Sequence, residues 1–332
     1  MPELRRDPVT GRWVIFSAER AQRPADFAFE EREPATAHCP FCEGHESDTP
    51  SEIQADRANG SLPNQPGWRV RVVPNKYPAL RIEGDLDKEG EGLYDRMNGV
   101  GAHEVFIEGP QHESSITALP HETFKSTVIA YRDRLSDLKK DRRLAYALIF
   151  KNVGVRAGAS LAHNHSQLIA TPVVPIRVKQ ELDGAHRFFE YRGRCIYCDI
   201  LRLELSKKSR IVLETKEFVA MVPYAARFPF EIWILPKRHI SHFEDTTDAE
   251  CAGLSEIILS VLGRLESALG APPYNYVIHT SPFVNGPLDH YHWHVEIMPR
   301  VTMAAGFEWG SGFYINPVLP EEAAKFLGNG GS

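Results

Sequence analysis

The feature that most constrains the fold of this chain is an internal repeat. The sequence EVFI at residues 104–107, followed by His112, returns 127 positions later as EIWI at residues 231–234, followed by His239. In both copies the histidine precedes apolar residues spaced three, four or seven positions apart, which is the spacing of one helix face. Because the unit is encoded twice, we expect two similar halves.

Each copy also contains a histidine-rich segment. HNHSQ at residues 163–167 aligns with HYHWH at residues 290–294 at the same offset, and Pro172 and Pro299 close the two segments. Alternating apolar residues and the closing prolines predict strands, in which side chains two positions apart share a face. The side chains at positions 163, 165 and 167 should therefore point the same way.

The offset between the copies grows towards the N-terminus. VVPN at residues 72–75 is similar to MVPY at residues 221–224, and the CxxC pair at residues 39–42 returns at residues 195–198. The first copy therefore carries insertions, and the polar, glycine-rich stretch at residues 83–101 predicts an exposed loop.

The order of these features predicts the fold class. Each copy runs from a CxxC pair through strands, a histidine and a helix to a histidine-rich strand, which indicates an α+β unit with a mostly antiparallel sheet. We expect two such repeats joined as a pseudo-twofold unit, with halves at residues 1–178 and residues 179–332. Residues 300–332 form a tail without a counterpart.

Composition excludes several classes of protein. Hydrophobic residues make up 42% of the 332 and charged residues 25%, which is typical of a globular chain. The net charge of −6 offers no basic excess to neutralise phosphates, so nucleic acid is not an expected partner. The longest charge-free run, between Arg156 and Arg177, is too polar to span a membrane. The N-terminus lacks the apolar segment of a signal peptide, so we expect a cytoplasmic protein.

The cysteines indicate metal sites. Four of the five form two CxxC pairs, and each half adds two histidines, which completes a tetrahedral zinc set of two thiolates and two imidazoles. The predicted ligands are Cys39, Cys42, His112 and His163 in the first half, and Cys195, Cys198, His239 and His290 in the second. Two Zn²⁺ ions per chain are expected. A redox CxxC would need a βαβ context, which is absent around the first pair.

Other histidines compete for these sites. The alternative ligands are His38, His45 and His103 in the first half, and His242 and His292 in the second. The fifth cysteine, Cys251, falls on a helix face and is expected to be a small core residue.

His165 is the candidate catalytic residue. It lies two positions beyond the ligand His163 and two before Gln167, so alternation aims all three side chains the same way. A neutral imidazole held in one tautomer is a good nucleophile towards phosphorus. Gln167 could donate a hydrogen bond to a phosphoryl oxygen, and the glycine-containing loop at residues 154–160 offers donors suited to phosphates.

Several motifs together resemble one known family. They are DPVTGRW at 7–13, Arg20, RP at 23–24, CPFC at 39–42, Asn152, GAS at 158–160, HNHSQ at 163–167, VPY at 222–224, FPFE at 228–231 and PFVNG at 282–286. The chain resembles the galactose-1-phosphate uridylyltransferase branch of the histidine-triad superfamily over nearly its whole length. The resemblance implies that both halves are histidine-triad-like, and that members are homodimers whose tail helps to build the neighbouring subunit's site.

The resemblance also implies a double-displacement nucleotidyl transfer. His165 would attack the α-phosphorus of a nucleotide sugar, release a sugar 1-phosphate, and pass the nucleotidyl group to a second phosphate acceptor. Gln167 would hold the phosphoryl oxygen of the covalent intermediate. The residues expected to contact substrate are Arg20, Arg23, Asn75, Asn152, Gly158, Ser160 and Gln167.

Two alternatives in the second half stay open. In some members Glu181 ligates a second metal together with His279, His292 and His294, whereas here two thiolates compete, and we favour them because thiolates bind zinc better than one carboxylate. The HYHWH segment could hold a second nucleophile, but we favour a degenerate copy because only the first half has the loop and Gln167.

The chain departs from the uridylyltransferase pattern at the acceptor side. Asn164 stands where these enzymes have proline, and the tail at residues 306–317 lacks their hexose-binding Tyr-Glu pair. The tail and Ser166-Gln167 look more like ADP-glucose phosphorylase, a family member that uses inorganic phosphate. On family frequency we expect uridylyl transfer of galactose metabolism, from UDP-glucose to hexose 1-phosphate. The alternatives are adenylyl transfer from ADP-glucose to phosphate, a histidine-triad nucleotide hydrolase, and a zinc-stabilised binding protein without catalysis.

Overall fold

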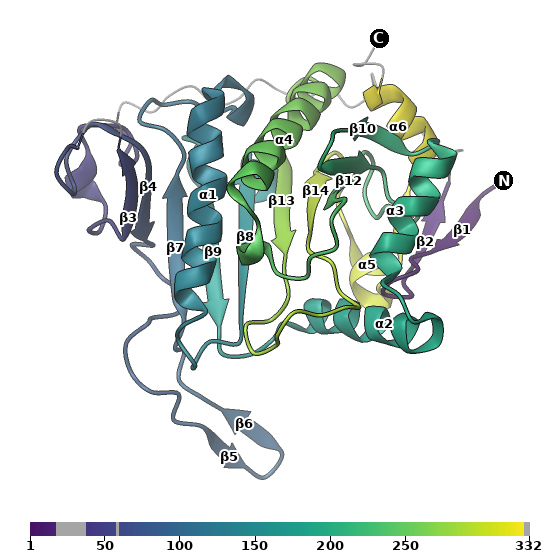
Figure 1. The fold of residues 1–332 in the computed structure, drawn as a ribbon, viewed down its shortest axis with the longest axis horizontal. Coiled ribbons are helices and arrows are strands. Elements are labelled where there is room, and N and C mark those ends of the chain that lie inside the picture. The colour runs from purple at the N-terminus through teal and green to yellow at the C-terminus, as the bar shows by residue number, and fades with distance from the viewer. Residues whose placement is uncertain (18–37, 58–59, 329–332) are drawn as a thin grey trace.

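The computed structural model describes residues 1–17, 38–57 and 60–328 and centres on a ten-stranded antiparallel sheet (Figure 1). In spatial order, its strands are β10 (Ile211–Glu214), β11 (Phe218–Met221), β12 (Ile232–Pro236), β14 (His294–Pro299), β13 (Tyr274–His279), β8 (Tyr146–Val153), β9 (His165–Thr171), β7 (Ala102–Ile107), β4 (Trp68–Pro74) and β3 (Gln54–Arg57).

The sheet is built from two copies of one five-stranded unit. Strands β8 and β13 pair at its centre, with Asn152 opposite Asn275, and outwards from this pair the order β8-β9-β7-β4-β3 mirrors β13-β14-β12-β11-β10. Helices α1 (His121–Leu138) and α4 (Asp248–Leu269) lie beside each other on one face (Figure 1). This arrangement confirms the predicted α+β class with paired repeats.

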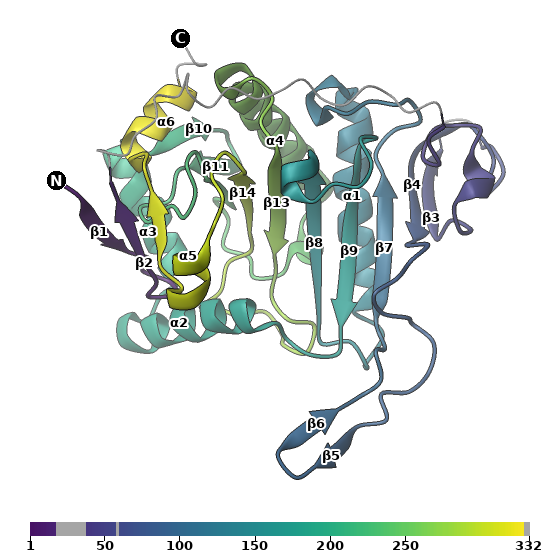
Figure 2. The same cartoon turned by 180° about the vertical axis from the view of Figure 1, so that it is seen from behind.

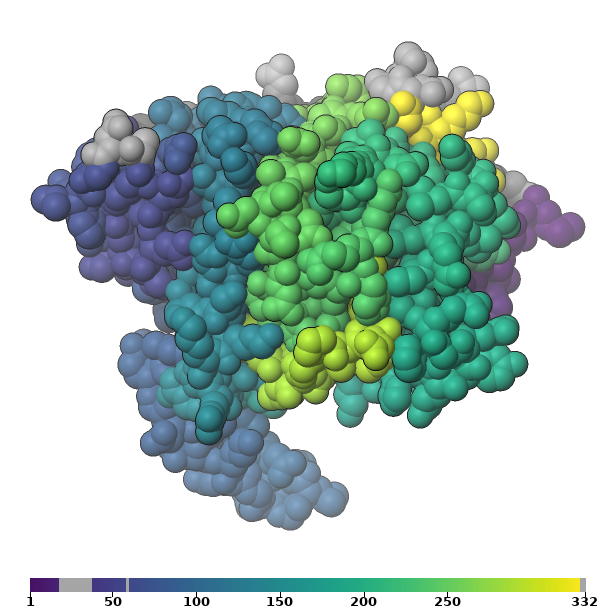
Figure 3. All heavy atoms as spheres, in the orientation of Figure 1, coloured from purple at the N-terminus to yellow at the C-terminus, as the bar shows by residue number. Residues whose placement is uncertain are grey.

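The main core lies between these two helices and the sheet. The apolar residues that carry the three-, four- and seven-residue spacing in the sequence are buried on both helices; they are Phe124, Tyr131, Leu135, Leu138, Cys251, Ile258, Leu262 and Leu265. Strand residues such as Leu168 and Ile234 face them. Thr247 and Glu250 form a capping box that fixes the start of α4. Figure 3 shows the helices covering this face of the molecule.

The opposite face of the sheet differs between the halves. In the second half it is covered by α2 (Ile176–Arg192) and α3 (Ile196–Lys207), so that all six residues of β14 are buried. In the first half β9 alternates, with Gln167, Ile169 and Thr171 only half-buried. Among the described residues no helix covers that face, so the first half keeps an open surface beside its histidine-rich strand.

The chain ends pack beside the second half. Strands β1 (Glu3–Arg6), β2 (Trp13–Phe16) and β15 (Tyr314–Asn316) form a small sheet, flanked by α5 (Gly306–Ser311) and α6 (Pro320–Gly328) (Figure 2). The four 3₁₀ helices of the described residues are η3 (Glu46–Asp48), η4 (Ile116–Ala118), η5 (Val155–Ala157) and η6 (Phe243–Asp245). Among the described residues, none of the helices has the length and apolar character to cross a membrane.

The stretch predicted as an exposed loop protrudes from the body as an arm. Residues 83–101 are almost entirely exposed, and within them β5 (Glu89–Glu91) pairs with β6 (Tyr94–Arg96) (Figures 1 and 3). The exposure was predicted, whereas the hairpin was not, because its strands carry no alternating apolar pattern.

Candidate functional site

The first cysteine–histidine cluster joins four residues from three separate segments. The four ligand atoms of Cys39, Cys42, His112 and His163 lie within 4.8 Å of one another. Cys42 Sγ is 3.5 Å from His112 Nδ1 and 3.6 Å from His163 Nδ1. Ligand atoms around a tetrahedral zinc are separated by about 3.5 Å at ordinary Zn–S and Zn–N bond lengths, so this geometry fits the ion.

The contacts around His163 orient it as a ligand. Its Nε2–H donates to the carbonyl oxygen of Gly109 at 2.9 Å, which leaves the lone pair on Nδ1, the atom that faces both thiols. Metal-binding histidines commonly have such a carbonyl partner. Burial lowers the pKa of His163 to about 4, so the ring is neutral and can bind metal at neutral pH.

The second cluster contains His292 instead of the predicted His290. Cys195, Cys198, His239 and His292 have ligand atoms within 4.8 Å of one another. Cys198 Sγ is 3.4 Å from His239 Nδ1 and 3.7 Å from His292 Nδ1, and His292 Nε2–H donates to the carbonyl oxygen of Pro236 at 2.9 Å. His290 lies outside the cluster, with its ring 4.9 Å from that of His186.

A difference in loop length explains this correction. Phe150 of β8 pairs with Gln167 of β9, and Val277 of β13 pairs with Glu296 of β14. With Val277 as the counterpart of Phe150, 127 positions later, the counterpart of Gln167 is Glu296, which lies 129 positions later. The β13–β14 connection is thus two residues longer than the β8–β9 connection. The structural counterpart of His163 is therefore His292, and that of His165 is His294.

Three of the other candidate ligands have other partners. His45 Nδ1–H donates to the carbonyl oxygen of Cys39 at 2.6 Å and supports the CxxC turn, while His38 pairs with Asp48. His242 is a core residue with its ring nitrogens near Ser241 and the carbonyl of Pro282.

Metal analysis of two neighbouring variants tests the corrected ligand set. His292→Ala is expected to lower the zinc content from about two ions per chain to about one, because the remaining three donors leave the tetrahedral set incomplete. His290→Ala, the matched control two residues away, should keep both. Loss of zinc in the control with retention in His292→Ala would contradict the assignment.

His165 lies at the start of β9 with its ring held in one tautomer. Its Nδ1–H donates to the carbonyl oxygen of His163 at 2.7 Å, so the lone pair is on Nε2. Burial lowers its pKa, and the side chain is neutral at neutral pH. Phe41, from the CxxC turn, packs against the ring with centroids 5.3 Å apart. The cysteine–histidine cluster and the candidate nucleophile therefore lie at the same corner of the sheet.

A buried polar network supports the strand from behind. Lys151 Nζ donates to the carbonyl oxygen of His165 at 3.1 Å and pairs with Glu108. The Tyr131 hydroxyl donates to Glu108 at 2.7 Å and bonds with the Ser166 hydroxyl at 2.6 Å. These four side chains are at most 1% exposed.

The second half lacks this network. By strand register Lys151 corresponds to Ile278 and Ser166 to Val295, and by the helix offset Tyr131 corresponds to Ile258. Buried charges are costly and are retained in particular places only when they are paired. The network therefore gives β9 a buried polar support that β14, where Val295 stands in place of Ser166, does not have.

The predicted substrate residues lie on or near the open face. Gln167 shares a face with His165, and Asn75 Nδ2 is 3.5 Å from Gln167 Oε1. Asn152 Oδ1 accepts a hydrogen bond from Asn275 at 2.7 Å.

The loop after β8 is tightly folded. Ala157, Gly158 and Ala159 each donate their backbone N–H to a carbonyl within the loop. Gly158 has a φ of 86°, a left-handed conformation that favours glycine, and Ser160 is exposed. Arg20 and Arg23 lie outside the described residues.

The corresponding position in the second half is closed. His294 is 1% exposed and its ring stacks on His279 with centroids 4.8 Å apart, between Tyr197 and Trp233. The structure therefore gives substrate no access to a second nucleophile here.

Glu181, His279, His294 and Glu296 form a further group of possible ligands, but His292 belongs to the thiolate cluster instead. Although burial opposes it, the carboxylates of Glu181 and Glu296 raise the pKa of His279 to about 10. Both ring nitrogens of His279 face carboxylates, with Nδ1 3.1 Å from Glu181 Oε2 and Nε2 3.4 Å from Glu296 Oε2. The thiolate cluster offers two thiolates and two imidazoles, the donor set typical of structural zinc.

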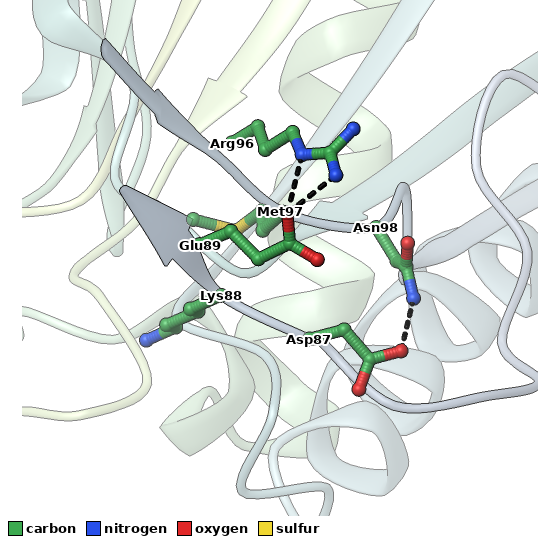
Figure 4. Close-up of a pocket in the computed structure, with 6 residues that line it drawn as sticks. All are labelled: Asp87, Lys88, Glu89, Arg96, Met97 and Asn98. Atoms are coloured by element: carbon green, nitrogen blue, oxygen red, sulfur yellow. Dashed lines mark hydrogen bonds and ion pairs between the residues drawn. The ribbon is translucent and has the colours of Figure 1, made fainter. Parts of the chain in front are cut away.

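A hollow on the arm is separate from this site. Figure 4 shows its lining, in which Arg96 pairs with Glu89 and Asn98 donates to Asp87. These residues are exposed, so the interactions between them are weak.

Comparisons with known proteins identify one family along nearly the whole chain. Family models described as galactose-1-phosphate uridyl transferase, N-terminal and C-terminal domains, match residues 1–175 and 181–306. ADP-glucose phosphorylase of Arabidopsis thaliana is 40% identical over 98% of this chain and 92% of its own length. Galactose-1-phosphate uridylyltransferase of Thermotoga maritima is 30% identical over 98% of both chains.

Solved structures give the same result. An ADP-glucose phosphorylase from Arabidopsis thaliana with bound ADP-glucose superposes with a TM-score of 0.84 at 38% identity, covering 99% of both chains. A uridylyltransferase structure superposes with a TM-score of 0.77 at 30% identity, covering 99% of this chain and 98% of its own.

Proposed function

Because the chain belongs to the galactose-1-phosphate uridyl transferase family, we propose that it transfers the adenylyl group of ADP-glucose to inorganic phosphate. The observation that carries this choice is the 40% full-length identity to an ADP-glucose phosphorylase, against 30% to the uridylyltransferase of Thermotoga maritima. Family frequency alone ranks uridylyl transfer first, and the identities favour the adenylyl alternative instead. The missing Tyr-Glu pair in the tail supports the same choice.

The first half-reaction uses the lone pair on His165 Nε2. It attacks the α-phosphorus of ADP-glucose, the bond from that phosphorus to the bridging oxygen breaks, and glucose 1-phosphate leaves with the bond's electron pair. The Nδ1–H bond to the His163 carbonyl stabilises the ring as it gains positive charge. Gln167 donates to the phosphoryl oxygen as it gains negative charge.

The second half-reaction reverses these steps with another acceptor. An oxygen of inorganic phosphate attacks the same phosphorus, the P–N bond to His165 breaks, and ADP leaves. The ring then has its lone pair back on Nε2, so the products balance as ADP and glucose 1-phosphate. On this proposal Asn152, Gly158 and Ser160 lie near the phosphates, Asn75 acts with Gln167, and Arg20 and Arg23 act near the nucleotide.

The two zinc sets have a structural role in this proposal. Zinc bound by two thiolates and two imidazoles has no open position for substrate. In the first set the ion would tie the CxxC turn, which carries Phe41, to the strand that carries His165. We also propose that the chain works as a homodimer and that the halves at residues 1–178 and 179–332 are its two repeats.

A four-way substrate comparison tests the proposal. We expect ADP-glucose with inorganic phosphate to exceed UDP-glucose with galactose 1-phosphate in kcat/KM by at least about tenfold, which corresponds to about 1.4 kcal/mol of discrimination. The crossed pairs, ADP-glucose with galactose 1-phosphate and UDP-glucose with phosphate, show which substrate carries the difference. A higher kcat/KM for UDP-glucose with galactose 1-phosphate would contradict the proposal and support uridylyl transfer. Release of AMP into water would indicate a hydrolase.

A further inference from the structure

His103 belongs to neither zinc cluster and lies on the catalytic face. It is half-buried on β7, where Val105 pairs with Gln167, so His103 is two positions along the strand from Gln167's direct partner and shares its face. Its Nε2 is 2.8 Å from Gln167 Oε1. Its ring therefore contacts the side chain that the mechanism assigns to the phosphoryl oxygen.

The backbone determines which tautomer His103 adopts. The N–H of Ala79 donates to His103 Nδ1 at 3.1 Å, so Nδ1 carries a lone pair and the proton of the neutral ring is on Nε2. This Nε2–H then donates to Gln167 Oε1. A flipped Gln167 would place an NH₂ group against an N–H, with no acceptor between them.

Asn75 supports the same orientation of the Gln167 amide. Its Oδ1 accepts from the N–H of Tyr77 at 2.9 Å, and its N–H donates to the carbonyl of His103 at 2.8 Å. The NH₂ of Asn75 consequently lies 3.1 Å from His103 Nε2 and 3.5 Å from Gln167 Oε1. Because His103 Nε2 carries the ring proton and cannot accept, Gln167 Oε1 is the acceptor of the two. Two donors converge on the amide oxygen of Gln167, so its NH₂ is the end that can donate to a substrate.

The second half has other residues at the positions of His103 and Gln167. β7 and β12 correspond at 128 positions, since Trp233 pairs with Glu296 as Val105 pairs with Gln167. Glu231 therefore stands in place of His103, and Glu296 in place of Gln167, and both carboxylates bind Arg227. The His–Gln pair occurs only in the half that contains His165, the candidate nucleophile.

We propose that His103 is a positioning residue that fixes the Gln167 amide with its NH₂ towards the transferred phosphoryl group. This inference rests on the proposed nucleotidyl transfer through His165. A freely rotating amide presents its oxygen to the phosphoryl oxygen part of the time, and two oxygens repel. The hydrogen bond from the Gln167 NH₂ matters most in the transition state, when the phosphoryl oxygen gains negative charge. Loss of His103 should therefore lower the rate of the first half-reaction rather than the affinity for ADP-glucose.

The test compares three variants with the wild type in single-turnover reactions with ADP-glucose. His103→Leu is expected to lower the rate of glucose 1-phosphate release by about ten- to a hundredfold, less than the factor of about 10² to 10³ typical for removing a charge-stabilising donor itself. The KM for ADP-glucose should change by less than about threefold. His103→Gln keeps an N–H donor and should recover much of the rate. His121→Leu, on the distant helix α1, is the matched control and should match wild type.

A double-variant cycle separates positioning from an independent role. If His103 acts through Gln167, then His103→Leu has little further effect in a Gln167→Leu background. Additive losses, a rise in KM alone, or an unchanged rate in His103→Leu would each overturn the inference. The unfolding temperature and zinc content of His103→Leu show whether this variant has a folding defect. If it has, the rate of glucose 1-phosphate release by the folded His103→Gln variant tests the inference instead. If the wild-type protein itself does not cleave ADP-glucose, the proposed function fails, and not this inference alone.

Discussion

Replacing His165 by alanine is expected to abolish nucleotidyl transfer while the protein keeps its fold and about two zinc ions per chain. Alanine removes the atom that attacks phosphorus, and the other described side chains on this face of β9, Gln167, Ile169 and Thr171, offer no imidazole, so kcat should fall by at least about 10³-fold. The rate of glucose 1-phosphate release from ADP-glucose and elemental analysis of zinc provide the two measurements.

The control for this variant is His294→Gln. His294 is the structural counterpart of His165, but its side chain is buried beneath α2 and α3. We expect it to reduce stability without a comparable loss of kcat. Loss of zinc in His165→Ala with residual transfer would mean that ligand and nucleophile are exchanged, and full loss of activity in folded His294→Gln would contradict the assignment of the active half.

The second large effect concerns the buried ion pair behind the strand. Lys151→Ile leaves the Glu108 carboxylate buried without its cation, and removal of one partner from a buried pair costs about 3–5 kcal/mol. The free energy of unfolding from urea titration measures this cost. Activity should fall as well, because the carbonyl of His165 loses its donor.

The matched control replaces both partners. Glu108→Leu with Lys151→Ile gives the first half an apolar interior similar to that of the second half, where Ile278 stands at the position of Lys151. This double variant should recover most of the lost stability, since no charge remains unpaired, but not the full transfer rate. Equal stability of the single and double variants would contradict the interpretation of the pair.

Much of the fold follows from the sequence because the repeat encodes it twice. The helix spacing locates α1 and α4. The first histidine-rich segment does lead into a strand, but β9 begins at His165, so His163 precedes it, and burial alternates only from Ser166 to Thr171. Likewise the CxxC pair and two histidines suffice to predict the first cluster. Cys39 and Cys42 lie in one turn, and the predicted His112 and His163 are the histidines that join them.

The errors in the second half arise from small changes of register. A fixed offset of 127 assigns His290, but the β13–β14 connection is two residues longer, which places His292 in the cysteine cluster instead. The EVFI and EIWI segments correspond at 128 positions in the sheet, and a shift of one residue moves side chains to the other face. No sequence offset reveals such a shift without the pairing partners.

The buried ion pair behind β9 could have been predicted from the sequence. Lys151 and Glu108 are charges within or at the end of apolar strands, and such charges are rarely buried unless paired. His103 was one of several possible ligands, and only its contact with Gln167 reveals another role. The choice between adenine and uracil could not be read, because the expected nucleotide contacts, Arg20 and Arg23, distinguish phosphates and charges rather than bases.

The covalent intermediate provides the most direct test of the central claim. The wild-type protein is incubated with ADP-glucose in the absence of phosphate, and its intact mass and peptide map are recorded. We predict the addition of one adenylyl group, on the peptide that contains His165, which is acid-labile and is released as ADP when phosphate is added. An unmodified protein that nevertheless turns over ADP-glucose, or an adduct on His294 or another residue, would contradict the account.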